Sequence, residues 1–143
     1  MSSERFSGVL APVITPFQEN LAANHSRFAD HCRWITDHGC GLAVFGTNSE
    51  ANSMSVPEKI DLLDHLVATG IKPKLMMPGT GCCALTDAIK LTNHVLSLGC
   101  RSVLMLPPFY FKKVSDEGLY AYYSSVIEGV GNSNLRIYLY HIP

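Results

Sequence analysis

Short apolar runs alternate with longer amphipathic segments along the whole chain, and this alternation restricts the possible fold more than any other feature. Each run is mostly apolar and usually has Gly or Pro close by, which is typical of strands buried on both faces of a parallel sheet. The five runs are residues 9–14, 42–45, 75–77, 103–106 and 137–140. The pattern therefore predicts the element order βαβαβαβαβ.

The segments between the runs carry helix signals. Ser55 and Glu58 form a capping-box pattern with Pro57 in the first turn, and Ser115 precedes two acidic residues, which the helix dipole favours there. We expect helices that begin near residues 26, 55, 85 and 115, the first three of which end at a glycine. The residues expected on the buried face are Phe28, Cys32, Trp34, Ile35 and His38 in the first helix, and Leu119, Tyr122, Tyr123, Val126 and Ile127 in the fourth.

Strict alternation implies right-handed crossovers and leaves two folds open, a (β/α)8 TIM barrel and an open doubly wound sheet. A barrel usually needs about 250 residues, so in that case residues 1–143 are the N-terminal part of a single barrel domain and cover roughly its first five strands. An open five-stranded sheet would be complete. Against it, residues 15–20 contain no glycine for a phosphate-binding turn, and the turn at 79–81 lacks a P-loop lysine. Nucleotide binding is therefore unsupported.

Composition excludes several classes of partner. The 11 basic residues are scattered and nearly matched by 12 acidic ones, so no stripe could follow nucleic-acid phosphates. No apolar stretch reaches the ~18 residues of a membrane helix, and no apolar signal core opens the chain. Five cysteines without framework spacing indicate free thiols in a reducing, cytoplasmic compartment. His31 and His38 stand two helical turns apart, about 10 Å, so we expect no metal, and no cofactor is indicated.

Hydroxyl-bearing residues follow three of the apolar runs, at 46–50, 107–110 and 140–143. Hydroxyls gathered at strand exits indicate a proton-handling site, because the carboxyl ends of parallel strands meet at one end of the sheet. A buried strand that closes on an aromatic residue and a proline also calls for a following helix. We therefore expect further chain past Pro143 to complete the site.

Taken together and in order, these loops resemble a known family. The matching motifs are Gly8-Val9, Thr15-Pro16-Phe17, Gly46-Thr47-Asn48-Ser49-Glu50, Pro78-Gly79-Thr80-Gly81, Pro107-Pro108-Phe109-Tyr110, Glu117-Gly118-Leu119 and Tyr140-His141-Ile142-Pro143. They are similar to the N-terminal half of the dihydrodipicolinate synthase and N-acetylneuraminate lyase family. No single motif is decisive, but their succession along nearly the whole chain is specific.

The resemblance implies a TIM barrel that joins or cleaves 2-keto acids, such as pyruvate, with an aldehyde as second substrate, through a lysine Schiff base. It makes the protein a class I aldolase-type lyase or synthase. It implies that Tyr140 moves protons, linked through Thr47 to a Tyr110 donated by a neighbouring subunit, so that we expect a homo-oligomer, a dimer or tetramer. The backbone N–H groups around Thr47 and Asn48 would hold the carboxylate of the keto acid. Without the resemblance, Tyr140 reads as a core aromatic, Tyr110 as interface packing and Thr47 as a turn residue.

Two features depart from the family pattern. Asn48 and Ser49 replace the third and fourth members of the usual Gly-Thr-Thr-Gly-Glu loop, and the Schiff-base lysine of the family belongs to a sixth strand, past Pro143. None of the lysines present stands at an equivalent position. A second hypothesis is therefore a non-catalytic half-barrel that acts as an interaction module. A phosphate-binding flavodoxin-like domain is the third hypothesis, and it has the least support.

Overall fold

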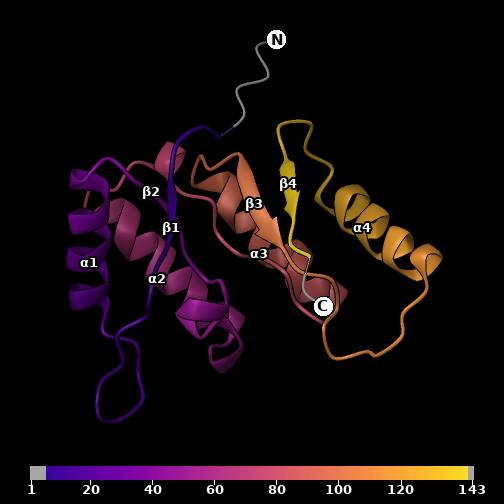
Figure 1. The fold of residues 1–143 in the computed structure, drawn as a ribbon, viewed down its shortest axis with the longest axis horizontal. Helices are drawn as coiled ribbons and strands as arrows, with labels where there is room; N and C mark the ends of the chain where they lie inside the picture. Colours follow the sequence, from indigo (N-terminus) through magenta and orange to yellow (C-terminus); the bar gives the residue numbers. More distant parts are fainter. Residues whose placement is uncertain (1–5, 142–143) are drawn as a thin grey trace.

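The computed structural model describes residues 6–141 of the chain, which contain four parallel strands and four α-helices (Figure 1). The strands are β1 (Leu10–Pro12), β2 (Gly41–Ala43), β3 (Ser102–Met105) and β4 (Arg136–Leu139). The helices are α1 (His25–Asp37), α2 (Val56–Ala68), α3 (Leu85–Ser97) and α4 (Asp116–Val130). Three 3-10 turns are η1 (Thr47–Ser49), η2 (Ala51–Ser53) and η3 (Pro73–Leu75).

The third expected strand, residues 75–77, is the one expected element that the structure does not form as a regular strand. Residue 75 ends the 3-10 turn η3, and the segment that follows makes only isolated parallel bridges, Leu42 with Met76 and Gly79 with Leu104. The segment 76–80 nevertheless lies between β2 and β3, because Met77 N–H donates to the Leu42 carbonyl at 2.8 Å and Thr80 N–H to the Leu104 carbonyl at 3.0 Å. Pro78 has no N–H to donate, which explains why the ladder is interrupted.

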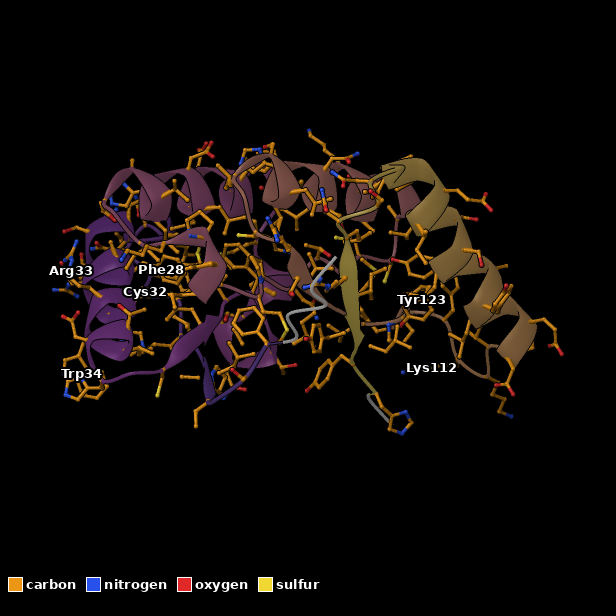
Figure 2. The ribbon with its side chains drawn as sticks, turned by 90° about the horizontal axis from the view of Figure 1, so that it is seen from above. Phe28, Cys32, Arg33, Trp34, Lys112 and Tyr123 are labelled. Carbon is orange, nitrogen blue, oxygen red and sulfur yellow. The ribbon has the colours of Figure 1, made fainter. Side chains whose placement is uncertain are left out.

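The parallel array therefore runs from β1 through β2 and segment 76–80 to β3 and β4. The helices cover one side of it, and viewed from above they form an arc from α1 to α4 (Figure 2). Between strands and helices lies the core, in which the largest fully buried side chains include Phe28, Phe45, Leu42, Leu62, Leu63, Leu66, Met76, Leu91 and Met105. Among residues 6–141, no helix is both long and apolar enough to span a bilayer.

The expected helix ends are confirmed, whereas two helix faces need correction. Ser55 caps α2 and forms the reciprocal capping box with Glu58, and Ser115 caps α4. In α1, Phe28 and Cys32 point to the strands, but Trp34 is 61% exposed and points away (Figure 2). Its ring packs against the ring of His38, also exposed, with centroids 4.3 Å apart and the ring planes tilted by 36°.

In α4, the expected buried face is only partly realised. Ile127 was expected to face the sheet, but its side chain is 54% exposed, and Val126 is the one buried residue of this helix. Consecutive residues of an α-helix point about 100° apart. The buried stripe is narrow, so it includes Ile35 and Val126 but not their neighbours Trp34 and Ile127. Their apolar character therefore did not predict their burial.

Candidate active site

The loop after β2 turns sharply on two residues with left-handed backbone, Phe45 (φ 61°) and Glu50 (φ 54°). Between them lies η1, in which Ser49 N–H donates to the Gly46 carbonyl at 3.1 Å and Glu50 N–H donates to the Thr47 carbonyl at 3.1 Å. The N–H groups of Thr47 and Asn48 open this turn and donate no hydrogen bond within residues 6–141. Both residues are exposed, so these two N–H groups are free to receive an anion.

Ser49 joins this loop to the end of β1. Its side chain is fully buried, and its hydroxyl donates a hydrogen bond to the carbonyl of Val13. Nearby in sequence, Thr15 carries the one enclosed polar side-chain atom without a partner among the described residues. The serine that departs from the family pattern therefore has a structural role, which is to hold two strand exits together.

The loop at the end of segment 76–80 packs backbone against backbone on both sides. A Cβ at Gly79 would lie 2.2 Å from the Phe45 carbonyl oxygen, and a Cβ at Gly81 would lie 2.6 Å from the backbone nitrogen of Leu106. Neither position has room for a side chain, since real Cβ atoms never come so close to backbone atoms. This loop thus fixes the spacing between the exit of β2 and that of β3.

Tyr140 follows β4 directly. Its N–H donates to the Met105 carbonyl at 3.0 Å, which continues the β3–β4 pairing past Leu139, and its side chain is half-buried. Two residues earlier, the Tyr138 hydroxyl accepts a hydrogen bond from the Phe6 N–H at 3.0 Å. Side chains two residues apart on a strand share a face, so the Tyr140 side chain lies on the same face of the sheet as that of Tyr138 and the Phe6 backbone bonded to it. The rest of the predicted motif, Ile142 and Pro143, lies outside the described residues.

Tyr110 lies on the surface, in the loop between β3 and α4. Its side chain is 76% exposed and makes an edge contact with Phe111, with ring centroids 5.5 Å apart. Thr47, Tyr110 and Tyr140 follow β2, β3 and β4 and so lie at the same end of the array, as predicted. Within residues 6–141 no hydrogen bond joins any two of the three hydroxyls. Their grouping at one end is seen, and their predicted catalytic and binding roles stay predictions.

Sequence reasoning missed one ionisable residue near this end, Lys59. Five of the six lysines are exposed, but Lys59 in the first turns of α2 is only 5% exposed, and burial lowers the pKa of its amine. The signal was present, because Lys59 falls three residues after Val56 and four before Leu63, on the buried stripe of the helix. The described part of the chain holds no group of three His, Cys, Asp or Glu residues that could bind a metal ion.

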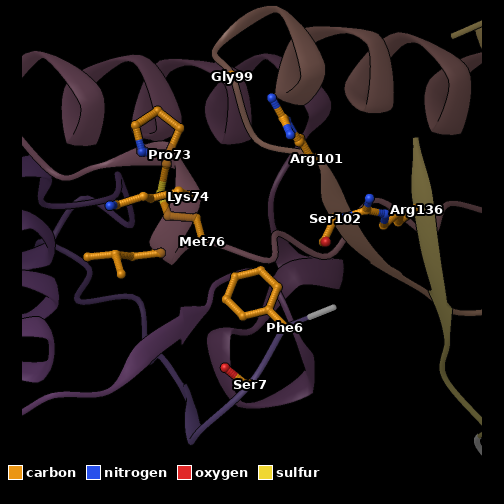
Figure 3. Close-up of a pocket in the computed structure, with 10 residues that line it drawn as sticks. Phe6, Ser7, Pro73, Lys74, Met76, Gly99, Arg101, Ser102 and Arg136 are labelled. Atoms are coloured by element: carbon orange, nitrogen blue, oxygen red, sulfur yellow. The ribbon is translucent and has the colours of Figure 1, made fainter. Parts of the chain in front are cut away.

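A cavity of about 540 Å³ lies at the opposite end, where the strands begin (Figure 3). Its walls come from the segment before β1, the η3 turn and the starts of β3 and β4, and they include Phe6, Lys74, Arg101 and Arg136. None of the predicted site residues lines it. The cavity is therefore separate from the hydroxyl-bearing end.

Comparison with known proteins bears on the fold and the family. The model of the dihydrodipicolinate synthetase family matches residues 5–143. An uncharacterized DapA-like lyase of Chloroflexus aurantiacus is 33% identical over 138 residues, which is 95% of this chain and 46% of that protein. A 4-hydroxy-tetrahydrodipicolinate synthase of Desulforamulus reducens is 31% identical over 144 residues, 100% of this chain and 47% of that protein. The chain spans about half the length of the curated relatives it matches.

Solved structures agree. The crystal structure of dihydrodipicolinate synthase from Agrobacterium tumefaciens superimposes with a TM-score of 0.90 at 33% identity and covers 95% of this chain and 48% of its own. A variant of Sulfolobus solfataricus 2-keto-3-deoxygluconate aldolase in a pyruvate complex gives 0.83 at 25% identity, covering 96% of this chain and 45% of its own. These structures are (β/α)8 barrels, so the predicted TIM-barrel fold is confirmed and the open doubly wound sheet is excluded.

Proposed function

The chain belongs to the dihydrodipicolinate synthetase family, and from that premise we propose that it forms part of a pyruvate-dependent lyase or synthase of the class I aldolase type. The observation that carries the proposal is the grouping of Thr47, Tyr110 and Tyr140 at the carboxyl ends of successive parallel strands. Barrel enzymes of this kind build their active sites at that end. We further propose that residues 1–143 are the N-terminal part of a single barrel domain.

The chemistry assigns a role to each residue. A protonated imine between a lysine and a 2-keto acid is an electron sink, so the adjacent carbon can lose a proton and attack an aldehyde. Tyr140 moves these protons, and Thr47 and Tyr110 extend the hydroxyl chain through which they pass. The N–H groups of Thr47 and Asn48, which donate no hydrogen bond in the described chain, bind the carboxylate of the keto acid.

The Schiff-base lysine comes from chain past Pro143 in this proposal. None of the lysines within residues 6–141 lies on a strand, and the buried one, Lys59, belongs to α2. The family resemblance instead points to a sixth strand. The relatives are about twice as long as this chain, which leaves room for such a strand.

Assembly and compartment follow from the same premise. Tyr110 and Phe111 present an exposed aromatic pair next to the site, which suits a homo-oligomeric interface through which Tyr110 reaches the partner subunit's site. The five cysteines are all free, as is usual in a reducing, cytoplasmic compartment. The alternative of a non-catalytic half-barrel rests on the absence of a strand lysine from the described residues.

The test combines intact mass with chemical trapping. The protein is incubated with pyruvate, with and without borohydride, and the adduct is mapped to a residue. A reduced pyruvate adduct on a lysine past Pro143 supports the lyase, whereas a mass equal to these 143 residues without an adduct supports the non-catalytic module.

A second test addresses the assigned tyrosine. Tyr140→Phe should lower kcat by about 10²–10⁴-fold, because general acid–base catalysis contributes on this scale. Tyr120→Phe is the matched control, since the Tyr120 side chain lies on α4 and is 77% exposed to solvent. Equal activity of both variants would remove Tyr140 from the mechanism.

A further inference from the structure

The cavity at the start of the strands has the size and the mixed lining of a small-molecule site. Its volume of about 540 Å³ lies within the range of known ligand pockets. Phe6, Pro73 and Met76 give it apolar walls, and charged and hydroxyl-bearing side chains complete the lining (Figure 3). Such pockets hold a ligand by apolar contact and orient it with a few polar groups.

The charged side chains of this cavity are all cationic. Lys74, Arg101 and Arg136 line it, whereas no Asp or Glu among the described residues does. The whole chain, by contrast, has 11 basic and 12 acidic residues. Positive charge gathered at a concave surface raises the local concentration of anions, so the cavity selects for a negatively charged ligand.

Two of these cations are not neutralised by the protein itself. Lys74 and Arg101 are exposed, and neither side chain takes part in a hydrogen bond or an ion pair within residues 6–141. Lys74 belongs to the η3 turn, and Arg101 directly precedes β3. The cavity therefore receives available positive charge from two separate segments.

A buried hydroxyl is an independent sign of a ligand. Ser102 is only 4% exposed, and its oxygen points from β3 toward Phe6 across the cavity (Figure 3). The hydroxyl makes no hydrogen bond within residues 6–141. It is nevertheless open to the cavity, because among the described side chains only Thr15 has a fully enclosed polar atom without a partner. A buried hydroxyl without a partner is costly, and a ligand in the cavity would supply one.

The apolar wall is held in place by a hydrogen bond. The Phe6 N–H donates to the Tyr138 hydroxyl at 3.0 Å, which fastens the segment before β1 to β4. On the neighbouring strand start, the Arg136 N–H donates to the Arg101 carbonyl at 2.9 Å. The walls that carry the aromatic ring and the cations are thus fixed to the same pair of strands.

We propose that this cavity binds a small organic anion, either a carboxylate or a phosphate ester, that has an apolar body. The anionic group pairs with Lys74 and Arg101 and accepts a hydrogen bond from the Ser102 hydroxyl. The apolar body packs against Phe6 and Met76. Thr47 and Tyr140 stand at the other end of the array, so this binding site does not depend on the proposed lyase activity.

Ligands that share one aromatic ring test the proposal. The full-length protein is titrated with benzoate, phenyl phosphate and neutral benzyl alcohol in a calorimeter, and with inorganic phosphate as an anion without an apolar body. We expect saturable binding of benzoate or phenyl phosphate below about 1 mM, and the tighter of the two identifies the charged group. Benzyl alcohol and inorganic phosphate should bind at least about tenfold more weakly, and added salt should weaken the binding of the anion.

Substitutions in the lining place the ligand. Arg101→Gln and Lys74→Gln should each weaken binding by about tenfold, the scale of a hydrogen bond to a charged group. Ser102→Ala should weaken it by about three- to tenfold, the scale of a neutral hydrogen bond. Lys72→Gln and Arg33→Gln are the matched controls, because both residues are exposed and neither lines the cavity.

Several outcomes would overturn the proposal. The intact protein might as a whole show no saturable binding of either anion, or Arg101→Gln and Lys74→Gln could bind as tightly as the controls, which would place the anion elsewhere. Equal binding of benzyl alcohol would contradict the role of the charges, and equal binding of inorganic phosphate that of the apolar wall. Lys74 and Arg101 are exposed, so their substitution should leave folding intact, and these two variants decide the matter if Ser102→Ala fails to fold.

Discussion

The two sides of the array are covered to very different degrees. On the β2 side, Leu62, Leu63 and Leu66 of α2 are fully buried, because α2 packs between α1 and α3. On the β4 side, α4 has an equally apolar sequence but buries only Val126, and Leu139 of β4 is 66% exposed. The comparison teaches that an apolar stripe is buried only where neighbours exist on both sides. Thr47 therefore follows a strand whose covering helix has neighbours on both sides, whereas Tyr140 follows a strand that pairs with β3 and is also bonded to Phe6.

The largest effect is expected when a buried leucine of α2 and an exposed isoleucine of α4 are each truncated to alanine. Leu66→Ala should lower the free energy of unfolding by about 2–5 kcal/mol, because it opens a cavity in a fully enclosed position. Ile127→Ala should change it by no more than about 0.5 kcal/mol, since that side chain is 54% exposed. Urea unfolding measures both. A comparable loss in the two variants would mean that α4 is covered in solution.

Two glycines give the next test. Gly79→Ala should cost about 1–3 kcal/mol, since the new methyl group meets the backbone of Phe45 and one of the loops must move. At Gly129 in α4 the methyl group would meet the tip of the Ile89 side chain, which can rotate away, and alanine is the better helix former. Gly129→Ala should therefore be near neutral. Thermal unfolding of both variants would detect the contrast, and an equal loss would refute it.

Removal of a helix cap should cost about the same stability on the β2 side as on the β4 side. Ser55→Ala and Ser115→Ala should each cost about 1 kcal/mol, because each serine accepts an N–H in the first turn of an exposed helix end. Hydrogen bonds from Ser55 also hold the pKa of Glu58 below its ordinary value. That contribution is present above the ordinary pKa and disappears as the pH falls through the lowered one. The stability of Ser55→Ala should therefore fall less on acidification, as urea unfolding at several pH values would show.

The smallest expected effect is a gain in stability from a substitution at Thr15, just after β1. Thr15→Val should raise the free energy of unfolding by up to about 1 kcal/mol, because it removes an enclosed hydroxyl without a partner and keeps the shape of the side chain. Chemical unfolding against the unmutated protein measures the gain. A loss would show that the Thr15 hydroxyl has a partner in solution.

Local signals allowed the helices and the end that carries the hydroxyls to be predicted. The barrel was predicted from the family resemblance, because the alternation of strands and helices alone also fits an open sheet. Ser55, Glu58 and Gly70 fixed the ends of α2, and the strand runs placed Thr47 and Tyr140 at one end. The sequence did not reveal that Ser49 bonds to Val13, 36 residues earlier, because no local pattern encodes such a contact. The burial of Lys59 was missed although its place on the buried stripe of α2 is a local signal, because lysine is rarely buried.

The hydrogen bond from Phe6 to Tyr138 has a consequence for biosynthesis. The two residues are 132 positions apart in sequence. At the usual 5–20 residues per second of translation, roughly 7–26 seconds pass between the synthesis of one and the other. During this interval the Phe6 N–H lacks the Tyr138 hydroxyl to which it donates in the folded protein. This hydrogen bond can therefore form only after β4 has been synthesised.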